Sequence, residues 1–432
     1  MMAALQILLY FFWLYFLVKI VRQHYFFRSS GVSPNALTTF FLFKVLAGIA
    51  LTLLYTYYYT DKTKSDIWRY FSDSVIISKL FFSHTKVWLQ VISGWGLNEP
   101  EVFRHILNTQ NFSHPESDFV TNNAFIIRVV SVLNILTAHS IYANTLIFNF
   151  LSFVGFTALY RAFSTFFKAY NRMLLAAFFL LPSVVFWSSG LLKDAFIFGS
   201  MGMLFYCWLH TSLPAAKRIA YLLFFASVLL LSKLQVLLMA AALLPILPTP
   251  FIRINNKWIM VMIVSYAVAL FALREHIVSL LCDRRNQFIE LGMQEQAGSL
   301  FSTVPCESSN TLLQMTHGFV DGLLQPFLWN TATYMNTLAG IENWLILGIS
   351  LAVWIRYASA KHINYRLAVF CFTFCIVNLT IIGTTVPIAG ALVHYRTISI
   401  PFLIIGVLST VNLEKFKYDI NRFLTLIFPT KS

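Results

Sequence analysis

Residues 36–58 read ALTTFFLFKVLAGIALTLLYTYY, an apolar run of 23 residues whose only charge is Lys44. A helix needs about 20 predominantly apolar residues to cross the hydrocarbon core of a bilayer, so this stretch is long enough to span one. The rest of the chain has the same character, because 58% of its residues are hydrophobic and only 11% are charged. Soluble domains carry about 25% charged residues. The sequence therefore excludes a water-soluble globular protein and predicts a polytopic membrane protein.

Further apolar runs, each bounded by charged or turn residues, lie before and after this stretch. Eleven candidate spans are expected in total, at residues 3–21, 36–58, 142–162, 172–189, 191–210, 219–232, 234–249, 258–273, 342–357, 367–386 and 396–412. The runs at 219–232 and 234–249 are short, and we interpret them as a tight hairpin of half-length or deeply buried helices around Ser232 and Lys233. The expected fold class is all-α, with about 11 transmembrane helices in a single membrane-embedded domain, residues 1–432.

The basic residues are distributed unevenly between the loops. One face, which includes the tail 413–432, carries 17 Lys and Arg residues against two acidic residues, Glu414 and Asp419. The positive-inside rule makes this face cytoplasmic, with the N-terminus outside and the C-terminus inside. Membrane orientation thereby accounts for the net charge of +14, and no nucleic-acid partner is expected.

The opposite face carries two long polar stretches, at about 60–141 and 274–341. In the first, the apolar segment 124–138 is too short to span and contains an arginine, so we expect an interfacial or re-entrant helix there. In the second, the patterns at 276–292 and 311–328 predict amphipathic helices, and the second of these could lie flat on the membrane or dip into it. Both could cover an active cleft, and the alternative is that they are interfacial bracing helices. Large outer loops favour an enzyme of the outer leaflet, because channels and carriers keep their loops short and place polar groups within their spans.

The first outer stretch contains polar side chains at helical spacing. If residues 65–80 form a helix, Asp66, Tyr70 and Asp73 share one face and Arg69 lies beside them. A carboxylate in this position could act as general base toward a sugar hydroxyl or hold a divalent metal ion. The alternative is a solvated interfacial helix whose aromatic residues lie at the headgroups while Arg69 pairs with an aspartate.

A second group of polar residues lies in the sequence WSSGLLKD at residues 187–194. Pro182 interrupts the preceding helix, and the Ser-Ser-Gly segment supplies backbone groups outside a helix near Lys193 and Asp194. A helix that begins near Gly190 would add the positive end of its dipole to the lysine, which suits a phosphate. The alternative is a short turn whose two charged residues lie among the lipid headgroups.

Further cations lie within or beside apolar sequence. Lys233 separates two apolar runs, and Arg396 follows His394 and Tyr395 at the outer end of the last span. A lysine at the centre of a bilayer costs about 2.5–3.5 kcal/mol on insertion scales, so Lys233 is expected to face a partner or water. The planar guanidinium of Arg396 matches a phosphate, and snorkelling to the interface is the alternative for both residues. Lys44 is expected to snorkel toward the cytoplasmic side.

Together these motifs resemble multi-spanning proteins of bacterial surface-polysaccharide systems. The residues that carry the resemblance are the WSSGLLKD stretch, Asp66, Tyr70, Phe71 and Asp73, the pair Ser232-Lys233, the pair Tyr395-Arg396, and Pro401. They look like GT-C-type glycosyltransferases that use polyprenyl-phosphate sugars and, less closely, like Wzy-type O-antigen polymerases. In GT-C enzymes an aspartate of the first outer loop activates the acceptor, which implies Asp66 or Asp73 as the base, with Asp61 third. If none of these acts, Asp194 is the next candidate.

The chain departs from the GT-C pattern at two points. A further N-out span precedes the first outer loop, and an Asp-Asp or Asp-Glu dipeptide is missing from that loop. The resemblance still implies a membrane glycosyltransferase of cell-surface glycan assembly in the bacterial inner membrane, with a polyprenyl-phosphate or polyprenyl-diphosphate sugar as donor and a glycan, lipid or protein as acceptor. The substrate-binding side chains that we assign are Lys193, Lys233, Arg396, Arg69, Tyr70, His394 and Tyr395.

Other functions stay open at this point. The alternatives are a polymerase or ligase of lipid-linked glycans, a flippase-like transporter and a structural subunit of an envelope machine. A divalent metal is a possible cofactor, and no motif names its ligands. Cys282 and Cys306 share the second outer stretch, where a disulfide is possible.

Overall fold

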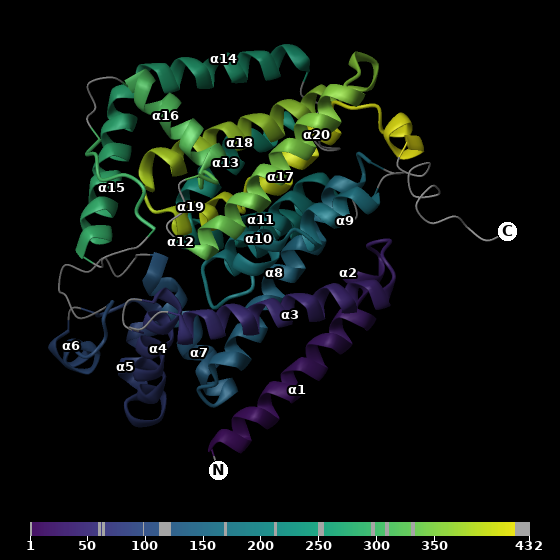
Figure 1. Ribbon diagram of the computed structural model, residues 1–432. Helices are drawn as coiled ribbons and strands as arrows, with labels where there is room; N and C mark the ends of the chain where they lie inside the picture. Colours follow the sequence, from purple (N-terminus) through teal and green to yellow (C-terminus); the bar gives the residue numbers. More distant parts are fainter. Residues whose placement is uncertain are drawn as a thin grey trace. The chain divides into compact units, whose positions relative to one another are not determined.

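The computed structural model describes residues 2–58, 62, 65–97, 99–111, 122–167, 171–210, 214–248, 255–294, 299–306, 311–329 and 333–419. Within these ranges the regular elements are all helices, accompanied by two isolated β-bridges (Figure 1). The all-α prediction is thereby confirmed. Asp61 and the part of the predicted tail after residue 419 lie outside the described residues.

Six helices of the described residues are long and apolar enough to cross a membrane. They are α1 (Met2–Gln23), α3 (Pro34–Tyr57), α8 (Ile141–Ser164), α12 (Ala215–Ser232), α17 (Tyr334–Tyr357) and α18 (Tyr365–Thr385). Two bent pairs raise the number to eight if each crosses as one unit, namely α14 (Asn256–Ala272) with α15 (Arg274–Gln294) and α19 (Ala389–Arg396) with α20 (Ile400–Leu408). The described chain therefore has six to eight candidate spans, where the sequence predicted about eleven.

The difference arises from helices that are broken or short. The predicted span 172–189 consists of α9 (Asn171–Phe179) and α10 (Pro182–Trp187), because a proline begins α10 and lacks the N–H that a continuous helix would need. α11 (Asp194–Leu209) and α13 (Leu234–Leu243) are apolar but have only 16 and 10 residues. Both fall short of the length that a bilayer requires.

Contacts within the chain form two compact units, and unit 1 comprises Met1–Phe166 and Val185–Ala240. The helices α8 and α11 pack together at its centre. A Cβ atom on Gly202 would overlap the backbone of Gly155, so the absence of side chains at this crossing lets the two helices approach closely. α3 also packs against α8 and joins the N-terminal helices to this centre.

The described part of the first outer stretch is helical. Its helices are α4 (Asp66–Ser83), α5 (Thr85–Ser93), α6 (Pro100–Ile106) and α7 (Asn122–Thr137). The predicted helix over 65–80 is therefore confirmed as α4. The segment 124–138, expected as an interfacial or re-entrant helix, forms α7, which packs against α4 through fully buried residues such as Ile77 and Ile127.

Unit 2 comprises Phe167–Val184 and Ala241–Ser432. Its most extensive helix contact joins α16 (Thr311–Leu324), which lies in the predicted segment 311–328, to α18. Gly318 and Gly322 of α16 lie against Gly383 of α18, and a Cβ atom on Gly383 would overlap the backbone of Gly318. α16 is thus fixed to a candidate span along a glycine-lined contact.

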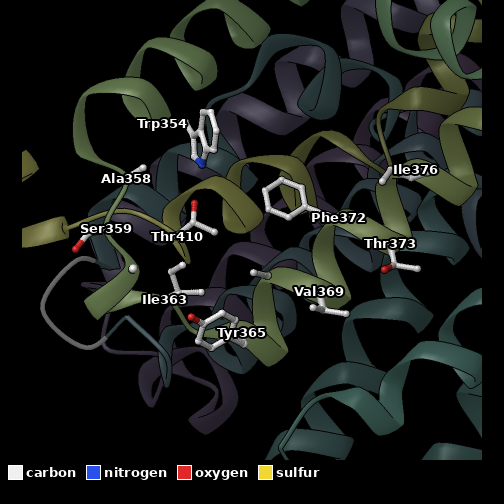
Figure 2. A pocket seen from close by; sticks show the side chains of 12 residues that line it. Trp354, Ala358, Ser359, Ile363, Tyr365, Val369, Phe372, Thr373, Ile376 and Thr410 are labelled. Atoms are coloured by element: carbon white, nitrogen blue, oxygen red, sulfur yellow. The ribbon is translucent and has the colours of Figure 1, made fainter. Parts of the chain in front are cut away.

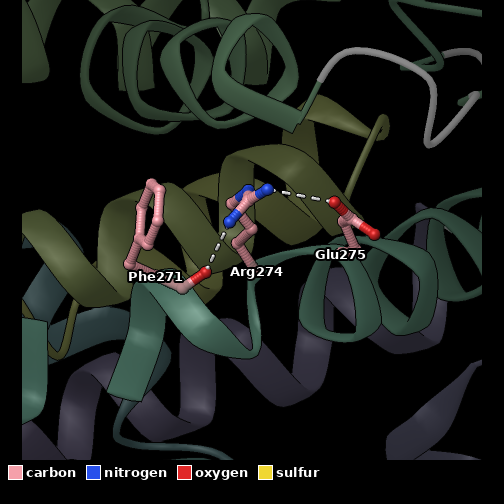
Figure 3. A network of polar contacts seen from close by, with 3 residues as sticks. All are labelled: Phe271, Arg274 and Glu275. Atoms are coloured by element: carbon pink, nitrogen blue, oxygen red, sulfur yellow. Dashed lines mark hydrogen bonds and ion pairs between the residues drawn. The ribbon is translucent and has the colours of Figure 1, made fainter. Parts of the chain in front are cut away.

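The predicted amphipathic helix 276–292 lies within α15, which meets α14 at a bend of 64°. Arg274, the first residue of α15, donates to the carbonyl of Phe271 at 3.0 Å and pairs with Glu275 at 3.1 Å (Figure 3). Its guanidinium also lies 4.3 Å from the centre of the Phe271 ring. The arginine thereby adds a side-chain donor to a carbonyl in the last turn of α14, which also accepts from the N–H of Leu273.

A disulfide joins Cys282 of α15 to Cys306, which settles the pairing that the sequence left open. Beside it, the backbone N–H of Cys306 donates to Asn286 Oδ1 at 2.9 Å. The segment 299–306 is therefore tied to α15 by a covalent bond and a hydrogen bond.

Candidate functional site

A turn at residues 188–193 connects α10 to α11 and is buried inside unit 1. Ser188 and Ser189 are both 0% exposed, and the N–H of Ser189 donates to the carbonyl of Phe186 at 3.1 Å. The predicted helix interruption is therefore present. The following helix begins at Asp194 rather than near Gly190.

Lys44 reaches this turn from the middle of α3. Its ammonium donates to the carbonyl of Ser188 at 3.1 Å, to Ser189 Oγ at 3.1 Å and to Ser188 Oγ, and it lies 4.5 Å from the centre of the Phe156 ring. The side chain is only 2% exposed. The prediction that Lys44 snorkels to the cytoplasmic side is wrong, because three oxygen atoms inside the protein accept its three N–H donors.

Small and polar residues of α3 and α8 hold the turn in place. Gly48 lies one helical turn after Lys44, and a Cβ atom there would come 2.5 Å from the carbonyl oxygen of Ser189. From α8, Ser152 Oγ donates to the carbonyl of Ser188 at 2.9 Å. The broken backbone thus finds hydrogen-bond partners within the protein, as backbone at membrane depth requires.

Asp194 is the charged residue that follows this turn. Its carboxylate is 4% exposed and interacts electrostatically with Lys44, Lys193 and Lys233. Lys233 is the residue between α12 and α13, with an extended backbone at φ −158°. α12 packs against α11 and ends near the residue at which α11 begins, so the two helices run antiparallel and bring Lys233 to Asp194.

Asp66 joins these residues from the first outer stretch. It is exposed in the first turn of α4, and its carboxylate interacts electrostatically with Lys193. α4 lies beside the turn, because a Cβ atom on Gly190 would lie 3.4 Å from the side chain of Ile67. We call the group Lys44, Asp66, Lys193, Asp194 and Lys233 the Asp194 cluster. All of its members belong to unit 1.

Asp73 has hydrogen-bond partners outside the Asp194 cluster. The carboxylate is 1% exposed and accepts three hydrogen bonds, from the backbone N–H groups of Gln110 and Asn111 at 2.9 Å and from Asn111 Nδ2 at 2.8 Å. Both of its oxygens therefore hold the chain that follows α6. These hydrogen bonds give Asp73 a structural role. Its catalytic role stays a prediction.

The other residues predicted on this face of α4 also contact the outer helices. The hydroxyl of Tyr70 donates to Asn123 Oδ1 of α7 at 3.0 Å, and Arg69 Nε donates to Gln110 Oε1 at 3.2 Å. Tyr70 is buried and Arg69 is half-buried. The alternative interpretation of this helix pairs Arg69 with an aspartate, whereas in the structure Arg69 Nε donates to a glutamine.

Arg396 lies in unit 2, where it caps the C-terminal end of α16. Its Nη1 donates to the carbonyl of Gln325 and lies 3.5 Å from the carbonyls of Gly322 and Leu323. The side chain is 3% exposed, its charge neighbour is Glu342, and its Nε has no hydrogen-bond partner among the described residues. A cation at this end of a helix is favourable because unpaired carbonyls gather there.

His394 and Tyr395 precede Arg396 on α19 and are half-buried, with ring centres 5.2 Å apart. Their predicted contact with substrate stays a prediction. In the described ranges, no three His, Cys, Asp or Glu side chains come together in a way that could hold a metal ion.

Sequence reasoning missed two members of the site. Lys44 was assigned to the membrane surface, and Ser188 was noted only as part of a polar turn, although the two residues bind each other. A single lysine in the middle of an apolar run was the available signal, because such a residue is costly unless it meets a partner.

Comparison of the chain with protein-family models, curated proteins and solved structures finds no match. The argument for function therefore depends on the geometry and the charges of the Asp194 cluster.

Proposed function

We propose that this chain is a membrane glycosyltransferase that uses a polyprenyl-phosphate or polyprenyl-diphosphate sugar as donor at the outer face of the membrane. The observation that carries the proposal is the electrostatic interaction of a single buried carboxylate, Asp194, with Lys44, Lys193 and Lys233. In the fully ionised cluster three lysines meet two carboxylates, so one positive charge remains. Charge buried in a membrane is costly unless it is compensated, and an anionic ligand supplies the compensation.

The ligand that best fits this excess is a phosphate attached to a membrane lipid. Lys193 and Lys233 are only half-buried, whereas Lys44 is 2% exposed and bound to the serines of the turn. The first two lysines are therefore the ones that receive the phosphate, and Lys44 holds the turn that presents Lys193. Asp194 offsets part of the repulsion between Lys193 and Lys233.

Asp66 is the proposed base. Its carboxylate is exposed, and it interacts with the same lysine that receives the phosphate. In the reaction, Asp66 takes the proton of the acceptor hydroxyl while that oxygen bonds to the anomeric carbon of the sugar. The bond between this carbon and the phosphate oxygen breaks, and its electron pair leaves with the phosphate. Lys193 and Lys233 stabilise the negative charge that grows on the departing group.

The same proposal includes the membrane and the orientation. The chain resides in a bacterial inner membrane with its N-terminus outside and its C-terminus in the cytoplasm, as the distribution of basic residues predicts. The acceptor is a glycan, a lipid or a protein of the cell surface.

The test is sugar transfer by purified full-length protein in vesicles that contain radiolabelled polyprenyl-phosphate or polyprenyl-diphosphate sugars. Lys193→Ala should lower turnover by about 10²–10³-fold, the effect of removing one preorganised group that stabilises transition-state charge. Lys193→Arg should recover only part of the loss, because a planar fork does not replace a compact ammonium. Lys86→Ala, which removes an exposed lysine of α5, serves as the matched control and should retain full activity.

Two outcomes would contradict the proposal. One is transfer at the wild-type rate by both Lys193→Ala and Lys233→Ala, which would reduce these lysines to structural residues. The other is passage of lipid-linked sugar across the bilayer without transfer, with the same dependence on Lys193, which would indicate a transporter.

A further inference from the structure

A groove of about 620 Å³ lies in unit 2, at the C-terminal end of α17 (Figure 2). It is bounded by the last turns of α17, by residues 358–363 and by the first half of α18, and Thr410 contributes from the chain after α20. Most of its lining is apolar, including Trp354, Phe372 and Ile376.

The groove follows the axis of a candidate span. Tyr365, Val369, Phe372 and Ile376 line it from one side of α18, and the last lies 11 positions after the first. At 1.5 Å per residue this is a length of about 16 Å along the helix. An apolar groove that runs along a candidate membrane-spanning helix suits a hydrocarbon chain in length and in polarity.

One end of the groove is closed by backbone hydrogen bonds. Ser359 N donates to the carbonyl of Thr410 at 3.1 Å, and Asn364 N donates to the carbonyl of Ser409 at 2.9 Å. In addition, Asn412 N donates to the carbonyl of Tyr357 at 2.8 Å. These bonds fix the connection between α17 and α18 to the chain after α20, so the end of the groove is preformed.

Basic residues surround this closed end. Lys361 is exposed and lies between Ala360 and Ile363, both of which line the groove, and Arg366 directly follows the lining residue Tyr365. Nearby on α17, Arg356 pairs with Asp419 at 3.5 Å. The exposed Lys361 thus places a positive charge at the closed end, beside the apolar groove.

We infer that the groove binds one acyl chain of an anionic phospholipid from the cytoplasmic leaflet, with the lipid phosphate beside Lys361. Charge complementarity selects this occupant, because the basic end lies on the face that the positive-inside rule makes cytoplasmic and anionic headgroups lie at that surface. Within the groove the acyl chain contacts Phe372 and Ile376, while Tyr365 and Trp354 lie at its sides, where amphipathic rings suit the interface. The site is independent of the proposed transferase activity.

The experiment is native mass spectrometry of the full-length protein after extraction from vesicles of phosphatidylcholine mixed with phosphatidylglycerol. The wild-type protein should retain one phosphatidylglycerol. Val369→Trp should abolish retention because the larger ring fills the groove, whereas Ile349→Trp on the lipid-exposed surface of α17 should not. Lys361→Gln should lower the retained fraction about fivefold, as expected for one basic residue near an anionic headgroup, and Lys415→Gln should leave it unchanged.

Thermal unfolding curves of the same proteins provide a second measurement, which does not depend on the yield with which each variant is extracted from the vesicles. Adding phosphatidylglycerol should raise the midpoint of wild-type protein and of Ile349→Trp but not of Val369→Trp, because a ligand stabilises only a fold that binds it. Inorganic phosphate should not reproduce the shift. Equal retention of phosphatidylcholine and phosphatidylglycerol by wild-type protein, or undiminished retention by Val369→Trp, would overturn the inference.

Discussion

Lys44 and Ser188, which lie 144 positions apart in the sequence, are joined twice, because the Lys44 ammonium donates to both the carbonyl and the hydroxyl of Ser188. The pair fastens the turn before α11 to the middle of α3. The turn that ends at Lys193 is therefore positioned from a helix near the start of the chain.

Replacing Lys44 by methionine should destabilise unit 1. The substitution removes the charged donor and leaves buried oxygens of Ser188 and Ser189 without it, at a cost of about 2–3 kcal/mol in the free energy of unfolding. Denaturant unfolding in detergent micelles measures the loss, and Lys19→Met, which alters an exposed lysine of α1, provides the reference. If the two variants are equally stable, the contact at Ser188 does not hold the turn.

The two aspartates of α4 should separate in their effects. Asp66→Asn should lower the rate of transfer by about 10²–10⁴-fold with unchanged stability, because the amide cannot accept the proton. Asp73→Asn should instead lower the unfolding free energy by about 1.5–3 kcal/mol, since it weakens three hydrogen bonds to a charged group. Measuring both activity per folded molecule and thermal stability distinguishes a catalytic role from a structural role for each aspartate. The reverse result would assign the base to Asp73.

His139 should make the stability of unit 1 depend on pH. Burial, and to a smaller extent the Lys79 ammonium, lower the pKa of the His139 imidazole below its ordinary value of 6.5. The unfolded chain then takes up a proton more readily than the folded one, so stability is complete above about pH 6.5 and falls as the pH drops toward the lowered folded pKa. Below that pKa the loss levels off.

Unfolding curves of wild-type protein and of His139→Asn test this dependence. Asparagine suits the left-handed backbone of this position, where φ is 59°, and cannot titrate, so this part of the pH dependence should disappear. His84→Asn at an exposed site should behave as the wild type does. A pH profile that is the same in all three proteins would rule out His139 as its source.

The side assignment can be tested by labelling single cysteines in intact cells. A membrane-impermeant maleimide should react with Glu101→Cys on α6 from outside. Lys415→Cys should react only after the membrane is opened, because the positive-inside rule predicts a cytoplasmic tail. The free cysteines Cys207, Cys371 and Cys375 are buried and should contribute little background. Labelling of position 415 in intact cells would invert the orientation.

The disulfide of the second outer stretch should contribute measurably to stability. The bond joins residues 24 positions apart, and closing a loop of this size is worth about 3.5 kcal/mol in a chain-entropy estimate. Replacing Cys282 and Cys306 together by alanine should lower the unfolding midpoint, and treatment with dithiothreitol should lower the wild-type midpoint by a similar amount. No change under either condition would show that the two thiols are not bonded in the purified protein.

Sequence alone predicts the parts of this fold that depend on local composition. The run 36–58 becomes α3 because length and hydrophobicity decide a membrane helix. Residues 65–80 become α4, in which side chains of one kind recur at helical spacing. The breaks at Pro182 and Lys233 were also visible, since each interrupts an apolar run. The effect of these breaks on the number of spans could not be predicted from the sequence. It depends on whether tertiary contacts supply hydrogen-bond partners for the backbone groups at each break.

Which residues come together in the site was harder to predict from the sequence. Lys193 and Asp194 are neighbours in the sequence, but the arrival of Lys233 depends on the antiparallel packing of α11 with α12. The contact of Lys44 with Ser188 depends on a glycine at position 48, which leaves room for the turn. The three hydrogen bonds to Asp73 likewise come from residues more than 30 positions away, so spacing could not distinguish it from Asp66.

The contact between Lys44 and Ser188 also has a consequence for the synthesis of the chain, because the two residues are translated at different times. Ser188 is translated 144 residues after Lys44, so the sequence of α3 is complete before the acceptors of its lysine exist. At about 5–20 residues per second, that interval lasts roughly 7–30 seconds. Throughout it, the nascent chain carries an ammonium in the middle of a membrane helix with its final acceptors not yet made. Production of the full-length protein should therefore be sensitive to how slowly residues 45–188 are translated, in a way that Lys44→Met relieves.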